Sequence, residues 1–143
     1  MKIDWIDEQV GLSGAIDDYN QLEGTVDFVV NARMECHDDL IELSKRGISY
    51  FWIPVVDYFP PTADQMKSLI KIIKCNPGKK ILVHCTLGMG RSATLVLMYM
   101  IWKYEYTVEE ALSKLQAIRP KVLPTQMQVD KLYKYYNRIR KGE

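Results

Sequence analysis

The chain has 143 residues, of which 48% are apolar, so it can bury one core and is expected to form a single domain over residues 1–143. Lys and Arg number 19 and Asp and Glu 18, a balance that gives no electrostatic reason to bind nucleic acid or a membrane surface. The longest apolar run, over residues 93–102, is too short to span a bilayer, and the N-terminus lacks an apolar secretion signal. We therefore expect a cytoplasmic location; we also expect a monomer, although the sequence itself does not indicate the oligomeric state.

The cysteines and histidines do not form a metal-binding pattern. Cys36, Cys75 and Cys85 show no Cys-x-x-Cys spacing, and only His37 and His84 are available beside them. We expect neither a metal nor another cofactor, and we expect reduced thiols.

In the N-terminal half, apolar runs alternate with turn residues. The pattern predicts a strand and turn over residues 10–14, a helical turn over 17–22 and a strand over 25–31. A helix over 38–46 is ended by Gly47, and a strand over 48–53 is ended by Pro54.

In the C-terminal half, three capping boxes mark helix starts at Thr62, Thr107 and Thr125. The first helix runs to about Cys75, a strand follows over residues 80–84, a helix begins at Arg91, and the helix after Thr107 ends at residues 119–120. The last helix is expected to cover the core with Val129, Leu132, Tyr133, Tyr136 and Ile139.

Strands that alternate with helices predict an α/β fold. We expect a central, mostly parallel twisted sheet of four to five strands, flanked by helices on both faces. In such a sheet, a functional loop lies at the carboxyl end of the central strand.

The loop between the strand at 80–84 and the helix at Arg91 is suited to bind an anion, because unpaired amides and the positive end of a helix dipole converge there. Cys85 opens the loop, and its thiol pKa is expected to fall from about 8.5 to roughly 4 to 6. Arg91 can bind two phosphate oxygens, and Ser92 can donate a hydrogen bond to the sulfur. The amides that would hold the anion belong to Thr86, Leu87, Gly88, Met89 and Gly90.

This segment resembles a known family signature. His84, Cys85, Gly88, Arg91 and Ser92 match all five fixed positions of His-Cys-x-x-Gly-x-x-Arg-Ser/Thr, the signature of the cysteine-dependent protein tyrosine phosphatases. The resemblance implies a phosphatase-like fold, hydrolysis through a phosphocysteine intermediate, and a phosphorylated protein or peptide as the partner. The alternative is a buried apolar cysteine followed by turn glycines.

Asp57 is the candidate general acid. It lies in the proline-bounded segment 53–61, and the resemblance implies this role because the family carries its acid in a similar Ile-Pro-x-x-Asp setting before the cysteine. After protonating the leaving oxygen, the same carboxylate would activate water. This chain order favours a compact dual-specificity-like member of the superfamily. The alternative interpretation of Asp57 is a turn aspartate.

The substrate class depends on weaker signals. Phosphatases of this superfamily that hydrolyse phosphoinositides usually carry lysines in the loop after the cysteine, and residues 86–90 contain none, so the resemblance disfavours inositol lipids. Those that remove the 5′ phosphate of RNA generally lack the acidic Asp, so the presence of Asp57 disfavours that activity too. Tyr58 and Phe59 are candidates to stack on an aromatic phosphoester, or else simple loop anchors. We expect phosphotyrosine, with phosphoserine and phosphothreonine as further candidates.

Gln126 and Gln128 are candidates to position the hydrolytic water. The family element Gln-Thr-x-x-Gln follows an Arg-Pro, and here Pro124 replaces its first Gln, whereas Gln128 matches the second. Gln128 also belongs to a capping box, which is the default interpretation.

Several residues have supporting or structural interpretations. His84 is expected to order the loop. Arg33 and Glu35 are interpreted as a solvated surface pair, although Glu35 could also pair with Arg91. Cys36 and Cys75 are interpreted as buried thiols without a role, the alternative being a protective disulfide with Cys85.

Two alternatives from other functional classes remain. One is a phosphate-binding module without turnover, and the other is a thiol enzyme of sulfur transfer or redox type. A set of Cys85, Arg91, Ser92 and Asp57 argues against both, because neither function needs all four residues.

Overall fold

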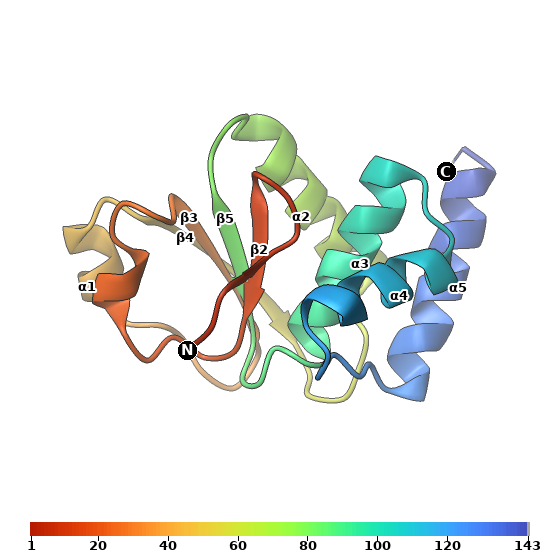
Figure 1. The fold of residues 1–143 in the computed structure, drawn as a ribbon, viewed down its shortest axis with the longest axis horizontal. Coiled ribbons are helices and arrows are strands. Elements are labelled where there is room, and N and C mark those ends of the chain that lie inside the picture. Colours follow the sequence, from red (N-terminus) through yellow and green to blue (C-terminus); the bar gives the residue numbers. More distant parts are fainter. Residues whose placement is uncertain (143) are drawn as a thin grey trace.

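A computed structural model describes residues 1–142 and has an α/β fold built on a five-stranded sheet (Figure 1). The strand order is β1-β2-β5-β3-β4, in which β1 runs antiparallel to β2 and the other neighbours are parallel. The strands are β1 (Asp4–Trp5), β2 (Val10–Ser13), β3 (Phe28–Arg33), β4 (Ser49–Val55) and β5 (Ile81–His84). The predicted mostly parallel sheet is confirmed.

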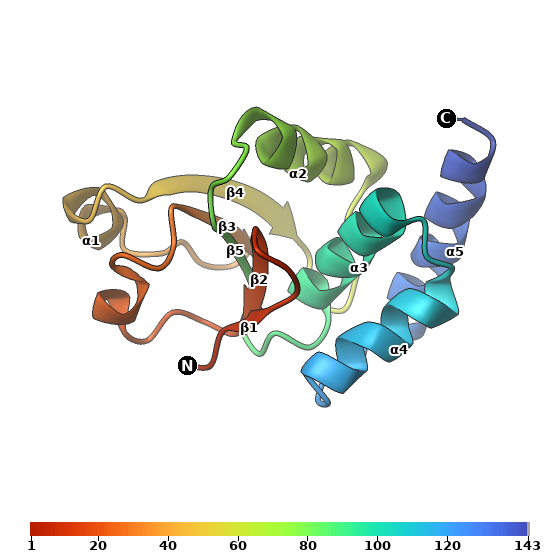
Figure 2. The same cartoon turned by 45° about the horizontal axis from the view of Figure 1, so that its top comes forward.

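Helices cover both faces of the sheet, as predicted. Figure 2 shows α1 with the short helix η1 on one side and α2 to α5 on the other. Two apolar clusters match this division, one holding Leu22 and Leu43 and the other the side chains of α2 to α5. The helices are η1 (Tyr19–Leu22), α1 (Leu40–Lys45), α2 (Ala63–Cys75), α3 (Arg91–Tyr104), α4 (Val108–Ile118) and α5 (Gln126–Arg140).

Helix α3 is the central helix of the larger layer. Its residues 91–101 are all buried, and it contacts the sheet as well as α2, α4 and α5. This explains why its sequence is apolar on every side. Within residues 1–142, no helix combines the length and the apolar character needed to cross a bilayer.

The three predicted capping boxes are present at Thr62, Thr107 and Thr125. In each, the threonine hydroxyl accepts from the amide three residues on, and the Gln or Glu there accepts from the threonine amide, which satisfies two otherwise unpaired donors.

Three details differ from the sequence-based expectation. Strand β4 continues through Pro54 to Val55, because β4 is an edge strand and a proline there removes no essential hydrogen bond. Strand β1 was not expected, since it has only two residues. On α5, Tyr133 is 40% exposed and Tyr135 is 7% exposed, because the buried stripe runs through Gln128, Leu132 and Tyr135.

Candidate active site

The loop between β5 and α3 lies at the carboxyl edge of the sheet. Strand β5 sits between β2 and β3, so the loop emerges from the middle of the sheet. Gly90 precedes α3, and no side chain caps the helix, which leaves the amides of its first turn free to bind an anion. Gly88 has a φ of 68°, a left-handed conformation that favours glycine.

Cys85 lies at the start of this loop and is 3% exposed. Its Sγ is 3.0 Å from the Ser92 Oγ. Burial by itself raises the pKa of the Cys85 thiol, but hydrogen bonds from the Ser92 hydroxyl and from the backbone of Ser92 and Gly88, together with the charge of Arg91, outweigh burial and lower it. The direction of this shift is the one expected from the sequence.

Arg91 is 2% exposed and is held by several acceptors. Its Nη1 and Nη2 donate to the two carboxylate oxygens of Glu35 at 2.6 and 2.9 Å, and Nη1 also donates to the Val55 carbonyl at 3.1 Å. The hydrogen bond from Arg91 lowers the pKa of Glu35 to about 2, and the Glu35 carboxylate in turn raises the pKa of Arg91.

This pairing corrects one expectation. Glu35 and Arg33 do not form a solvated surface pair, because Glu35 binds Arg91 and Arg33 instead binds Asp38 at 3.0 Å and the Asn31 side chain. The fold brings Glu35, in the segment after β3, to Arg91, 56 positions later in the chain, so the pair that forms is the alternative that the sequence left open.

Asp57 lies on a turn beside Arg91, with its Oδ1 3.5 Å from the Arg91 Nε. The next residue, Tyr58, has a φ of 68°, which is unfavourable for a side chain larger than glycine. The N-terminus of α5 holds this turn, since Thr125 Oγ1 donates to the Tyr58 carbonyl and Gln128 Nε2 donates to the Phe59 carbonyl.

A cavity of about 540 Å³ opens between the catalytic loop, the Asp57 turn and the start of α5. It contains the Cys85 and Arg91 side chains, so the expected nucleophile, anion-binding arginine and acid face one space. Its lining residues are Asp57, Tyr58, Cys85, Thr86, Leu87, Met89, Gly90, Arg91, Leu123, Pro124, Thr125 and Gln128.

Comparison with known proteins identifies the family. Residues 13–138 match the family model for the dual specificity phosphatase catalytic domain. The chain belongs to this family of cysteine-dependent phosphatases.

Individual relatives agree with this assignment. The chain is 31% identical to the tyrosine-protein phosphatase CDC14 of Candida albicans over 101 residues, which are 69% of this chain and 18% of that protein. It is 40% identical to the phosphatidylglycerophosphate phosphatase PTPMT2 of Arabidopsis thaliana over 91 residues, 60% of this chain and 40% of that protein. The chain therefore spans less than half the length of these curated relatives.

A solved structure extends the similarity to the whole fold. The active form of Tk-PTP superposes with a TM-score of 0.85 at 27% identity, covering 95% of this chain and 97% of that one. The phosphatase-like fold expected from the sequence is thus confirmed.

The two candidate glutamines lie in different places in this phosphatase domain. Gln128 is 1% exposed and lines the cavity, where its Oε1 also accepts from the Thr125 amide. Gln126 is exposed and donates to Asp130, outside the residues that line the cavity. Gln128 is therefore in both places that the sequence suggested, the capping box and the site.

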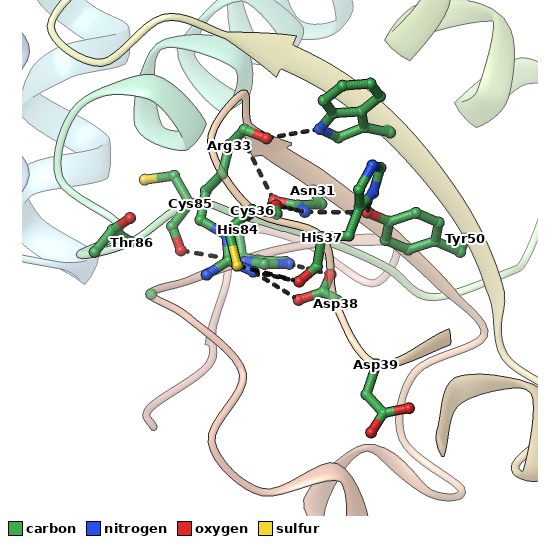
Figure 3. Close-up of polar contacts among 12 residues, drawn as sticks. Asn31, Arg33, Cys36, His37, Asp38, Asp39, Tyr50, His84, Cys85 and Thr86 are labelled. Carbon is green, nitrogen blue, oxygen red and sulfur yellow. Dashed lines mark hydrogen bonds and ion pairs between the residues drawn. The ribbon is translucent and has the colours of Figure 1, made fainter. Parts of the chain in front are cut away.

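His84 holds the start of the loop between β5 and α3 in place. Its Nε2 is 2.7 Å from Asp38 Oδ2, its Nδ1 is 3.2 Å from the Cys85 carbonyl, and both His84 and Asp38 are buried. Figure 3 shows Asp38 beside His84, with Arg33 and Asn31 in the same hydrogen-bonded cluster. Asp38 was not identified from the sequence, where it reads as the start of a helix.

Arg119 holds the same loop through its backbone carbonyls. The sequence analysis did not identify it as a site residue. The sequence marks it only as a helix end, yet it is 3% exposed and donates to the carbonyls of Gly88 and Leu87 at 3.0 and 3.1 Å. It also forms an ion pair of 2.8 Å with the buried Asp4 of β1. Arg119 thus satisfies two backbone carbonyls of the loop and helps to fix its shape.

Cys36 and Cys75 are exposed rather than buried, which corrects the earlier interpretation. All three cysteines are free thiols, and neither Cys36 nor Cys75 is among the residues that line the catalytic cavity.

Proposed function

We propose that this domain is a protein phosphatase that hydrolyses phosphotyrosine through a phosphocysteine intermediate. The observation that carries the proposal is the placement of Cys85, Arg91 and Asp57 around one cavity, with the Cys85 thiol pKa lowered. A nucleophile, an anion site and a proton donor are what the hydrolysis of a phosphate monoester requires.

In the first step, the Cys85 thiolate attacks phosphorus in line with the leaving oxygen. The sulfur–phosphorus bond forms as the bond from phosphorus to the leaving oxygen breaks, and Asp57 gives that oxygen its proton. Arg91 and the loop amides hold the three equatorial oxygens, whose charge they stabilise.

In the second step, water attacks the phosphocysteine and Asp57 accepts a proton from it. The sulfur–phosphorus bond breaks, inorganic phosphate leaves, and the Ser92 hydroxyl donates a hydrogen bond to the departing thiolate, 3.0 Å away in the resting structure. We assign the positioning of the water to Gln128, because it lines the cavity whereas Gln126 does not.

The walls of the cavity favour an aromatic phosphoester. Tyr58, Leu87, Met89 and Leu123 provide apolar surface around the opening, and three of them are more than half exposed, so a substrate ring would cover them. Residues 86–90 offer no lysine for a second phosphate group. Phosphoserine and phosphothreonine would fill the cavity less completely and are expected to react more slowly.

A lipid phosphate monoester is the second candidate substrate. The 40% identity to the phosphatidylglycerophosphate phosphatase PTPMT2 supports it, and the same two steps would apply. An acyl chain could lie on the apolar walls that we assign to a tyrosine ring.

A substrate panel tests the choice. We would compare kcat/KM for a phosphotyrosine peptide, the matching phosphothreonine peptide and phosphatidylglycerophosphate in detergent micelles, all in EDTA, with Cys85→Ser as the blank. The proposal expects the phosphotyrosine peptide to be fastest. A higher kcat/KM for the lipid would replace protein by lipid as the substrate class, and no hydrolysis of any of the three would contradict the enzyme assignment.

A further inference from the structure

A second cavity, of about 430 Å³, lies between α2 and α5 and is separate from the catalytic cavity. Both helices pack on α3, which lies between them in Figures 1 and 2, and Trp102 of α3 is among the lining residues. We call this cavity the α2–α5 groove. Its lining includes the apolar residues Ala63, Met66, Ile70, Trp102, Tyr135 and Ile139, the cations Lys67, Lys71, Lys74 and Arg138, and Cys75.

The lining of this groove is strongly positive, although the chain as a whole is nearly neutral. On α2, three lysines recur at spacings of four and three residues, and no acidic residue follows Asp64 in this helix. On α5, Arg138 lines the groove, whereas Lys131 and Lys134 line a separate cavity, and no acidic residue follows Asp130 in this helix.

These cations lack acidic partners. Among the described residues, none of the four cations that line the groove forms an ion pair with a carboxylate. An anionic ligand in the groove would supply the acidic partners that these side chains lack.

The shape of the groove favours a peptide over a lipid surface. Met66 and Tyr135 are buried, and Ile70, Trp102 and Ile139 are partly buried, whereas the three lysines of α2 are exposed. The apolar side chains thus lie below a cationic rim and are recessed from a flat membrane. A helix or strand with apolar residues along one edge and carboxylates on both sides would fit this arrangement.

We propose that the α2–α5 groove binds an acidic amphipathic segment of a phosphoprotein, which thereby delivers its phosphorylated residue to the catalytic cavity. The delivery role rests on the proposed function, whereas the binding does not. Helix α5 connects the catalytic cavity with the α2–α5 groove, because Gln128 lines the cavity and Tyr135 lines the groove. These residues are seven positions apart, which is about 10 Å along a helix, so a linker of about four extended residues would bridge them.

A binding experiment tests the groove without catalysis. The probe is a fluorescein-labelled 16-residue peptide with leucines every third and fourth position and glutamates on both flanks. The control peptide carries lysines in place of the glutamates. The full-length Cys85→Ser chain would be titrated, with fluorescence polarisation and Trp102 emission as readouts, and Trp102→Phe would assign the emission change.

Charge reversal at the groove provides the matched comparison. Lys67→Glu with Lys71→Glu is expected to weaken binding by about tenfold or more at low salt, since two attractions become repulsions. Lys79→Glu changes an exposed lysine away from the groove and is expected to leave affinity unchanged. Equal affinity in both variants, or equal binding of the lysine peptide, would overturn the proposal.

A kinetic experiment tests delivery. Joining the acidic peptide to a phosphotyrosine through a four-residue linker is expected to lower KM about tenfold in the native domain, and not in the Lys67→Glu, Lys71→Glu variant. Both proteins should hydrolyse p-nitrophenyl phosphate equally, which also shows that the variant folds. If the linked peptide and the phosphotyrosine without the acidic peptide have the same KM in the native domain, delivery is overturned. If the native domain does not hydrolyse p-nitrophenyl phosphate at all, the proposed function is contradicted instead.

Two parallel measurements test other occupants of the groove, a lipid surface and a second copy of this chain. Vesicles with 30% phosphatidylserine that bind the native chain and not the variant, while the peptide does not bind, would make the groove a lipid site. Dimerisation that Lys67→Glu with Lys71→Glu abolishes would make it a self-association site. Either result would overturn the proposal.

Discussion

Arg91 and Glu35 form a two-pronged ion pair in which the terminal nitrogens of the guanidinium bind both carboxylate oxygens, at 2.6 and 2.9 Å. The Nε edge of Arg91 instead faces Asp57, 3.5 Å away, on the side of the cavity. Glu35 thus fixes the plane of the guanidinium and leaves its Nε edge, which we propose binds phosphate, on the side of the cavity.

Replacing Glu35 by Gln should lower activity through Arg91. The charge-assisted hydrogen bonds that orient the guanidinium are weakened, and bonds of this kind contribute about 1.5–3 kcal/mol, so we expect kcat/KM to fall about 10- to 100-fold. Steady-state hydrolysis of p-nitrophenyl phosphate measures this. Unchanged kcat/KM would show that Arg91 needs no orienting partner.

The same pair should make stability depend on pH. The folded pKa of Glu35 is about 2, below the ordinary 4.5, so the stabilisation is complete above pH 4.5 and is lost as pH falls toward 2. The side chain is half exposed, and solvent screening keeps the effect small. Urea unfolding of the native chain and Glu35→Gln should therefore differ at pH 6 and converge near pH 2. A constant difference would contradict the assignment.

Ser92→Ala should raise the pKa of the Cys85 thiol, because the hydroxyl 3.0 Å from the sulfur stabilises the thiolate. We would measure the rate of inactivation by iodoacetate against pH in a Cys36→Ser, Cys75→Ser background, since both of those thiols are exposed. The midpoint should move to higher pH in Ser92→Ala. An unchanged midpoint would assign the lowered pKa to the loop amides and Arg91 alone.

Asp57→Asn should slow hydrolysis according to the leaving group. General acid catalysis contributes on the order of 10²–10⁴-fold, most for a phenol of high pKa. We expect a large loss with phosphotyrosine and a smaller loss with an activated aryl phosphate. The same loss with both substrates would show that Asp57 does not protonate the leaving oxygen.

Gly88→Ala should disrupt the catalytic loop. A Cβ at this position would lie 2.7 Å from the Ser13 carbonyl carbon and from Arg119 Nη2, and the φ of 68° adds strain, so we expect about 2–5 kcal/mol of destabilisation and little turnover. Gly78→Ala is the matched control, because its φ is 76° and its Cβ would meet nothing within 4 Å. It should cost about 1–2 kcal/mol and leave turnover unchanged. Equal effects would contradict the packing argument.

Local patterns were sufficient to predict most of the fold. Thr62, Thr107 and Thr125 mark helix starts through interactions within four residues, and the apolar run before Cys85 marks the central strand. Errors arose where contacts with another element decide the outcome. Asp4 and Trp5 form a strand only because β2 pairs with them, and Tyr135 is buried in place of Tyr133 because of how α5 packs.

The candidate site shows the same division. Cys85, Arg91 and Ser92 lie on one short segment, so the sequence displays their relation directly. Glu35, Asp38 and Arg119 reach that segment from 31 to 56 positions away, through contacts that no local pattern reveals. Monomeric state and cytoplasmic location stay predictions.

The most direct test of the central claim is turnover of p-nitrophenyl phosphate in EDTA by the native chain and by Cys85→Ser, with tungstate binding measured calorimetrically on both. The account predicts steady turnover by the native chain, loss of nearly all turnover in Cys85→Ser, and retained tungstate binding, because Arg91 and the loop amides stay in place. Comparable turnover in Cys85→Ser, or none in the native chain, would contradict it.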